Sequence, residues 1–541
     1  MGGKREYRGM RWQIKSPEEY IAKMREKTSV QEMRAFLIVF LSGICLYIPM
    51  IIYRLNCSDG NICGIIYRPH NDYDMEDIAG RYLLKYVAHM KSMFVFSWLA
   101  VILGLFFLVW GGMLICRILR IHSMLGIVIA GLFIILHPCF MDTFTFYFVS
   151  DAYLFCFVLA AYAVYLLQEK QNLIRMLGAA GCLFLSLTFY QAYLFVAVVL
   201  FLFVLLRDLL DDQKEWKEIG KGLLYQIGSG IIAVAVYVIL NKVFKMVGLI
   251  FYQESRFNIA DILNLPELAK AMVQSYSGFF KYFFAMDYIN NGWKIRYLVN
   301  GIYFLIGGIL LVTAICKKKR KWQNIVAVVV TVLILPIGFM GIGILNWREG
   351  QPRIIMLPAM VLLYIGILAL WYRERKTAET IQKICGWGLY AGTIYLLMIM
   401  SVYLSIYQLC KKYYVDKTDS MAQRIIAKIE NEYPETVAGC PVFICGDVDE
   451  GVYPQDYWIT QASYIMIGTQ ACDGMFVDNM QGYFAGWNLY MKSNFGVEYE
   501  MVWGRGQEIY DSDFYKEMPL WPADGCVRKT DDGIVVVKLK Y

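Results

Sequence analysis

Residues 176–206 read MLGAAGCLFLSLTFYQAYLFVAVVLFLFVLL and carry no charged side chain. A helix needs about 20 apolar residues to cross a bilayer, so this stretch is too long for one ordinary span and short for two. One span would place Arg207, Lys214 and Lys217 outside the cell, whereas Lys and Arg strongly prefer short cytoplasmic loops. We therefore predict two short spans that turn around residues 188–191.

Apolar runs recur along the chain and indicate a membrane protein. Of the 541 residues, 58% are hydrophobic and 18% are charged, whereas charged residues make up about 25% of an ordinary soluble domain. The net charge of +7 is interpreted as membrane topology, because no basic stripe alternates with aromatic residues as nucleic-acid binding would require. The sequence has no Walker A loop, no GxGxxG after a strand, and no HExxH or GxSxG motif.

The predicted fold class is mainly α: a polytopic membrane helical bundle of about 11 spans followed by a C-terminal extracytoplasmic α/β domain. Residues 1–34 form a cytoplasmic N-terminal segment, residues 35–408 form the transmembrane bundle, and residues 409–541 form the α/β domain. Besides the pair in 176–206, spans are expected near 35–53, 94–115, 123–140, 148–167, 222–244, 297–316, 324–345, 354–371 and 385–408.

Two long external segments interrupt the spans, residues 54–93 and residues 245–296. The second is rich in aromatic residues and suits a helix that lies on the membrane surface. After Lys411 the chain becomes polar, with an amphipathic helix expected over residues 421–433 and strands over 441–445 and 533–539.

The first external segment contains the acidic sequence RPHNDYDMEDIAGR, residues 68–81. Asp72 and Asp74 form a D-x-D pattern, which in soluble glycosyltransferases holds a metal and a nucleotide-sugar. Here they stand just outside the hydrocarbon and close to a cation, Arg81. A solvated loop without a chemical role is the alternative.

Three arginines are expected at the external membrane face, namely Arg81, Arg348 and Arg353. A planar guanidinium can hold a phosphate through two parallel hydrogen bonds, so these residues are candidates for binding a lipid phosphate. Arg353 is the best placed, because it follows Pro352 where a span begins. The alternative for each arginine is that it only extends toward lipid headgroups.

Four further residues are candidates for lining a substrate cavity. Asp142 and Asp151 bracket the second external turn, where Asp142 can sit in the membrane interface and Asp151 faces the bundle interior. Tyr190 and Gln191 lie at the proposed turn between the two short spans, as cavity lining or as packing partners.

These residues together resemble the bacterial Gtr type II family of polytopic membrane glucosyltransferases, which is considered GT-C-like. The resemblance is carried by residues 71–74 with Gly80-Arg81-Tyr82, by the Tyr190-Gln191 turn, by Arg348 and Arg353, and by the tail MPLWP at residues 518–522. The family usually has adjacent acidic residues, whereas Tyr73 separates Asp72 from Asp74 here. Either carboxylate therefore stays a candidate for the base.

The resemblance implies an inverting enzyme of the bacterial cell membrane, with its N-terminus in the cytoplasm and its C-terminus outside. Its donor is a polyprenyl-phosphate-linked sugar, often glucose, and its acceptor is a surface polysaccharide. Asp72 or Asp74 takes the proton of the attacking hydroxyl, and Arg353, with Arg81 or Arg348, stabilises the departing phosphate. A divalent cation, Mg²⁺ or Mn²⁺, is optional, because arginines can neutralise a monophosphate.

Two other functions are compatible with a polytopic chain. The first is a flippase or transporter of lipid-linked sugars, although the scarcity of charged residues inside the spans is unlike an ion-coupled transporter. The second is a non-catalytic scaffold for polysaccharide assembly, whose external domain binds glycan while the acidic loop is inert.

Overall fold

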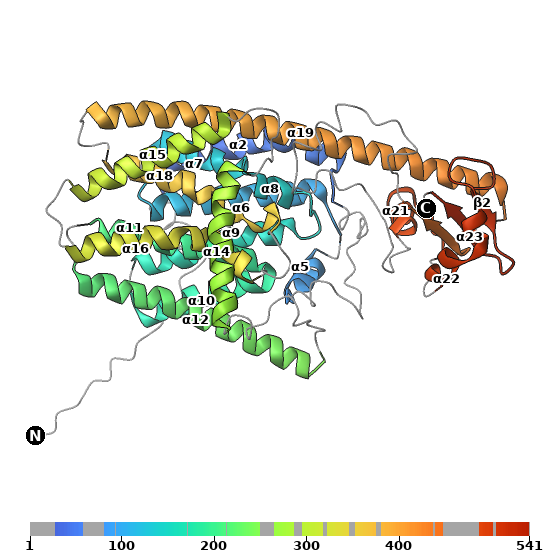
Figure 1. Ribbon diagram of the computed structural model, residues 1–541, viewed down its shortest axis with the longest axis horizontal. Helices are drawn as coiled ribbons and strands as arrows, with labels where there is room; N and C mark the ends of the chain where they lie inside the picture. Colours follow the sequence, from blue (N-terminus) through green and yellow to red (C-terminus); the bar gives the residue numbers. More distant parts are fainter. Residues whose placement is uncertain are drawn as a thin grey trace, which may run out of the picture.

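Figure 1 shows the computed structural model of the chain, a helical bundle with a small sheet beyond one end. The structure describes residues 28–57, 80–91, 94–169, 171–211, 214–248, 264–285, 295–316, 322–345, 352–374, 380–435, 439–446, 486–500, 502 and 505–539. Within these residues, eight helices are long and apolar enough to cross a membrane, which indicates a membrane protein. The total of about 11 spans stays a prediction.

Each predicted span contains at least one helix of the bundle, and one apolar core runs through it. The helices are α2 (Val30–Tyr53), α6 (Ser97–Ile118), α7 (Met124–Ile135), α8 (Pro138–Thr143), α9 (Ser150–Glu169), α10 (Leu173–Phe189), α11 (Leu194–Leu209), α12 (Trp216–Met246), α15 (Ile295–Cys316), α16 (Trp322–Phe339), α17 (Gly341–Leu345), α18 (Val361–Glu374) and α19 (Thr380–Glu432).

The stretch 176–206 forms two helices, with the break where the sequence predicts it. α10 ends just before Tyr190, and a short 3-10 turn, η1 (Gln191–Tyr193), leads into α11. At the far end of α11, Arg207 donates a hydrogen bond to Gln168 at the end of α9. Because α10 begins directly after α9, both outer ends of the pair lie at one end of the bundle. α10 and α11 therefore form a hairpin.

Charged side chains join several helices at that same end. Arg117 of α6 pairs with Glu32 of α2 at 2.9 Å, and Arg120 lies 3.7 Å from Asp211. α2 begins at this end, five residues before the predicted span, because Ser29 and Glu32 form a capping box. This is the end that carries the short basic turns, so it corresponds to the predicted cytoplasmic side.

Helix α14 (Leu265–Phe284) runs across the bundle at a steep angle to α15 and α16 (Figure 1). It packs against α15, α16 and α17 through one face, as an amphipathic helix does. A Cβ on Gly278 would lie 2.5 Å from Met340 Cε, so the close approach of α14 depends on this glycine. A helix expected within 245–296 is thus present as α14, and its position on the membrane surface stays a prediction.

The chain from residue 380 to 432 is one helix, α19, whereas the sequence analysis expected a span and a separate helix over 421–433. The change from apolar to polar composition after Lys411 does not break the helix, because no proline or glycine interrupts residues 411–432. α19 therefore leaves the bundle and reaches the sheet as a continuous rod (Figure 1).

The described residues after α19 include three strands, β1 (Val442–Cys445), β2 (Val527–Lys529) and β3 (Val535–Lys538). Their order is β1-β3-β2, with β1 parallel and β2 antiparallel to β3. Helices α21 (Gly486–Phe495), α22 (Gly506–Asp511) and α23 (Asp513–Glu517) accompany the sheet. Residues 421–429 of α19 pack into the apolar core on one face of this sheet, so the end of the rod is part of the tail.

Candidate active site

Interruptions of the helices gather at the end of the bundle opposite the basic turns. The short turn η4 (Ile354–Met356) packs against α8, and η5 (Pro358–Met360) packs against η1. Cys139 of α8 donates a hydrogen bond through Sγ to the carbonyl of Ile355 at 3.3 Å. Irregular backbone at membrane depth is tolerated where it is buried in protein or lines a cavity. This region is therefore the candidate active site.

Arg81 is bound from two other parts of the chain. Its Nη1 donates to the hydroxyl of Tyr153 on α9 at 2.9 Å, and its Nε donates to Gln191 Oε1 at 3.5 Å. The guanidinium also lies over the ring of Tyr190, with Cζ 4.5 Å from the ring centre. A cation over an aromatic face is attracted by the ring quadrupole. The structure thus brings together Arg81, Tyr190 and Gln191, which the sequence identified separately.

Further contacts fix the orientation of this cluster. The rings of Tyr153 and Tyr190 stack with centres 4.4 Å apart. Gln191 Nε2 donates to Tyr237 Oη on α12 at 2.9 Å, and Tyr237 Oη donates to the carbonyl of Gly80 at 3.3 Å. We call the five residues Arg81, Tyr153, Tyr190, Gln191 and Tyr237 the arginine cradle. Its side chains come from α9, the α10–α11 turn, α12 and the segment before α5 (Leu84–Met90).

Tyr82 follows the cradle arginine and turns toward α12. Its ring meets Phe244 edge to face, with centres 5.1 Å apart, and the side chain is buried. Burial, with a smaller contribution from Tyr237, raises the pKa of the Tyr82 phenol well above its ordinary value. Tyr82 therefore stays neutral at physiological pH and anchors the chain instead of acting as a base.

Asp151 lies in the first turn of α9 and is paired with Lys91. Lys91 Nζ is 2.9 and 3.0 Å from the two carboxylate oxygens of Asp151, and it also donates to the carbonyl of Phe148 at 3.4 Å. The side chains are only 8% exposed for Asp151 and 19% for Lys91. Asp151 therefore faces inward as predicted, but as a partner of Lys91, two residues away from Tyr153 of the cradle.

Asp142 is fully buried in α8, and its expected depth at the membrane interface stays a prediction. Tyr407 of α19 donates a hydrogen bond to its Oδ1 at 2.8 Å. Such a bond offsets part of the cost of burying a carboxylate, which explains how it is accommodated inside the bundle. This hydrogen bond joins α19 to α8 at the end of the bundle where the helix interruptions lie.

Arg353 stands immediately before η4 and is exposed. No hydrogen bond or ion pair joins its side chain to another of the described residues. The structure therefore puts Arg353 on the segment that packs against α8, but it does not join Arg353 to the arginine cradle.

Asp72, Asp74 and Arg348 lie outside the described residues, so their roles stay predictions. Within the described part of the chain, no three His, Cys, Asp or Glu side chains come together as a metal site requires. The optional Mg²⁺ or Mn²⁺ ion was assigned to the acidic loop and likewise stays a prediction.

Four contributors were not identified from the sequence: Lys91, Tyr153, Tyr237 and Tyr407. The three tyrosines lie within apolar helices, where a lone tyrosine resembles ordinary core packing. Lys91 had a usable signal, because it is a cation just before the predicted span 94–115. Asp151 is likewise a charged residue at the external end of a predicted span. Only the fold shows which hydroxyl reaches which charge.

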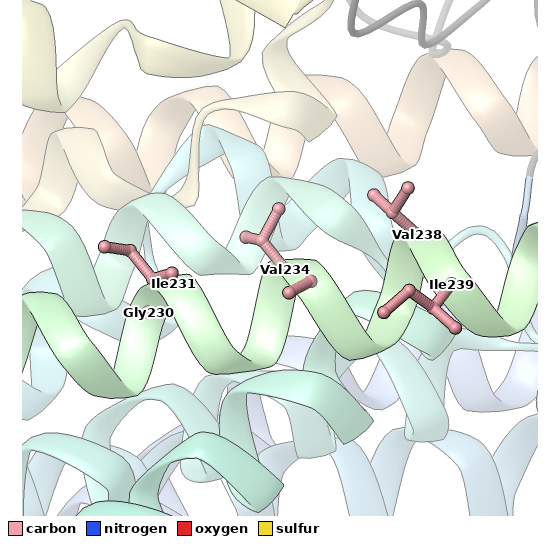
Figure 2. Close-up of a pocket in the computed structure, with 6 residues that line it drawn as sticks. Gly230, Ile231, Val234, Val238 and Ile239 are labelled. Carbon is pink, nitrogen blue, oxygen red and sulfur yellow. The ribbon is translucent and has the colours of Figure 1, made fainter.

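An apolar groove of about 480 Å³ runs along α12, lined by Gly230, Ile231, Val234, Ala235, Val238 and Ile239. Figure 2 shows that these residues occupy successive turns of this one helix. The groove has no charged or hydroxyl side chain to bind a sugar, so it is a lipid-facing surface and not a candidate for catalysis.

A comparison with protein families identifies one match. The model described as "Glucosyl transferase GtrII" matches residues 71–370, more than half of the chain. The matched part contains every candidate site residue named above except Tyr407. No curated protein and no solved structure matches the chain.

Proposed function

This chain belongs to the GtrII family of glucosyl transferases, and we propose that it moves a sugar from a polyprenyl-phosphate carrier to a cell-surface glycan. In this proposal the sugar is glucose, the reaction takes place on the outer face of a bacterial membrane, and the anomeric configuration is inverted. The family supports a glycosyltransferase, with a sugar donor and a sugar acceptor as substrates.

The observation that carries the proposal is the arginine cradle. A guanidinium held by Tyr153 at 2.9 Å and stacked on Tyr190 at 4.5 Å is fixed before any substrate arrives. Preorganised positive charge is effective in catalysis because it need not reorganise while negative charge develops. The cradle also connects the acidic loop to the helix interruptions, since Arg81 directly follows residues 68–80.

The proposed reaction is a single displacement. The acceptor hydroxyl oxygen bonds to the anomeric carbon while the bond from that carbon to the carrier phosphate oxygen breaks. The hydroxyl proton passes to Asp72 or Asp74, and the electron pair of the broken bond stays on polyprenyl phosphate, which gains one negative charge. A positioned carboxylate that takes this proton contributes about 10²–10⁴-fold in rate.

In the proposed mechanism, arginines stabilise the negative charge that develops on the leaving phosphate. Arg353 is exposed at the start of η4 and is proposed to bind this phosphate, with Arg348 beside it in sequence. Arg81, constrained by the cradle, provides a positive potential close to the acidic loop. Phosphate oxygens accept the paired N–H groups of a guanidinium. With these cations no metal is required, although Mg²⁺ or Mn²⁺ is compatible with the Asp72–Asp74 pattern.

The proposed orientation follows from the two ends of the bundle. The start of α2 and the basic turns lie at one end, and the cradle and the sheet lie toward the other. Because Lys and Arg in short loops mark the cytoplasmic side, we propose that the cradle and the C-terminal tail are extracytoplasmic.

The test uses the purified protein in lipid nanodiscs with polyprenyl-phosphate glucose and surface-glycan acceptors. We expect transfer by the parent protein and a loss of about hundredfold or more when the base is removed by Asp72→Asn or Asp74→Asn. Arg353→Ala should also slow transfer, whereas Asp513→Asn, at a side chain that is 95% exposed on α23, should not.

The outcomes separate the alternatives. Unchanged transfer in both acidic-loop variants would remove the loop from the mechanism. Movement of the lipid-linked sugar across a vesicle membrane without transfer would favour a flippase, and glycan binding with neither activity would favour a scaffold.

A further inference from the structure

Lys411 is a buried cation that the proposed mechanism does not use. Its side chain is only 1% exposed, and its Nζ has no hydrogen-bond partner within the described part of the chain. It lies beyond residues 71–370, so the family match says nothing about it. The next residue, Lys412, is by contrast 33% exposed and is paired with Asp416.

A buried ammonium without a partner is costly, because the hydration that it loses is not replaced. The cost amounts to several kcal/mol even after the protein relaxes. A buried lysine stays charged only where an anion compensates the ammonium. A charged Lys411 therefore requires a counter-charge from outside the described residues, and a bound ligand is the source that we test.

The position of Lys411 connects it to the candidate active site. Residues four apart on a helix are neighbours on one face, so Lys411 lies one turn beyond Tyr407, which binds the buried Asp142. Between them in sequence, Gln408 donates to the carbonyl of Leu46 at 3.0 Å and holds this turn of α19 against α2. Lys411 thus occupies the last firmly packed turn before α19 leaves the bundle.

We propose that Lys411 binds a phosphate group of a substrate. This inference rests on the proposed function, in which the donor and the leaving carrier both contain phosphate. Lysine binds phosphate as a point charge with three rotatable donors. Two sources share this chemistry, the phosphate of the carrier lipid and a phosphate-bearing acceptor glycan.

Binding to the full-length protein in nanodiscs tests the site without requiring turnover. The probes are polyprenyl phosphate, phosphate-free polyprenol and glycerol phosphate, and the proteins are the parent, Lys411→Met, Lys411→Arg and Lys412→Met. We expect Lys411→Met to raise the Kd of a phosphate probe at least about tenfold, while Lys411→Arg and Lys412→Met keep it close to the parent value. Polyprenol should bind all four proteins equally.

Thermal unfolding without ligand provides the second readout. Because Lys411→Met removes an uncompensated charge, its Tm should equal or exceed that of the parent. Adding polyprenyl phosphate should no longer raise the Tm of this variant. If Lys411→Met weakens binding of polyprenyl phosphate alone, the site belongs to the carrier; if it weakens binding of glycerol phosphate alone, the site belongs to the acceptor. Equal Kd values for both phosphate probes in Lys411→Met and the parent would overturn the proposal, as would equal weakening by Lys411→Arg.

The transfer assay keeps this inference separate from the proposed function. A parent protein that binds polyprenyl phosphate through Lys411 but transfers no sugar would contradict the enzyme and leave the phosphate site intact. Full transfer by Lys411→Met with an unchanged Kd would leave the enzyme intact and remove the site.

Discussion

The guanidinium of Arg81 lies over the ring of Tyr190, with Cζ 4.5 Å from the ring centre. The contact joins the segment after the acidic loop to the turn of the α10–α11 hairpin. The segment after the acidic loop and the turn within residues 176–206 are therefore in direct contact. Substituting one residue at a time measures what each side chain contributes to transfer.

The hydrogen bond from Arg81 to Tyr153 should contribute to transfer. A hydrogen bond to a charged group contributes about 1.5–3 kcal/mol, and 1.36 kcal/mol corresponds to tenfold in rate. Tyr153→Phe should therefore lower kcat/KM about tenfold to hundredfold, and Arg81→Lys, which loses the planar stacking, by at least as much. Arg120→Lys, at a residue 55% exposed at the opposite end, is the control. Parent-like kinetics of Arg81→Lys would show that stacking has no role.

Gly80 should be required for the direction in which Arg81 points. Its φ is +73°, a left-handed conformation that costs other residues about 1–2 kcal/mol. We expect Gly80→Ala to lower both Tm and transfer. Gly181→Ala, in the middle of α10, meets nothing within 4 Å and should leave transfer unchanged while stabilising the helix slightly. If the two variants behave alike, the backbone conformation at Gly80 is not important.

The pair Lys91–Asp151 should show strong coupling. Removing one partner of a buried ion pair costs roughly 3–5 kcal/mol, because a charge is left buried without compensation. Lys91→Met should therefore lower Tm markedly, and adding Asp151→Asn should restore part of the loss. Lys492→Met, which breaks a pair with Glu498 whose side chains are about half exposed, should have little effect. Additive losses in the double variant would argue against a paired carboxylate.

Tyr407 should stabilise the buried Asp142. Tyr407→Phe removes a 2.8 Å hydrogen bond to a carboxylate, so it should reduce the free energy of unfolding by about 1.5–3 kcal/mol. Tyr276→Phe removes a hydroxyl from an exposed hydrogen bond to the carbonyl of Leu333 and serves as the control. Denaturation in detergent monitored by fluorescence measures both. A Tyr276→Phe loss as large as that of Tyr407→Phe would contradict the assignment.

The orientation can be tested by labelling single cysteines. In intact cells, a membrane-impermeant maleimide should react with Asp513→Cys on α23 and not with Lys217→Cys on α12, two exposed positions at opposite ends of the molecule. The parent protein, with its own cysteines, measures the background. Labelling of Lys217→Cys from outside would reverse the proposed orientation.

The sequence predicted the helical bundle well, because apolar length and the position of basic turns are strong local signals. The break near Tyr190 followed from the charge of Arg207 and its neighbours, and the structure contains it. The separate short helix α8 was missed, although Pro138 begins it, because its apolar residues merge with the preceding run. α19 was divided wrongly, since a change in polarity does not by itself end a helix.

The site was harder to predict because it depends on contacts between distant residues. Arg81 and Gln191 were identified as polar residues near a membrane face, yet nothing local indicates that they meet across 110 positions. In the sequence, Tyr237 and Tyr407 resemble ordinary core residues. The structure shows that the Tyr237 hydroxyl accepts a hydrogen bond from Gln191 and that the Tyr407 hydroxyl donates one to Asp142. Charge and spacing therefore identify candidates, whereas packing determines their partners.

Because α19 is one continuous helix, the direction in which the sheet faces around the helix axis is fixed relative to the bundle. A helix turns about 100° and rises about 1.5 Å with each residue. Deleting one residue between Lys412 and Asp419 would swing the sheet through that angle around the rod while Tyr407 stayed on Asp142. Relatives of different length here are therefore expected to differ by whole turns, or to present another face of the tail to its surroundings.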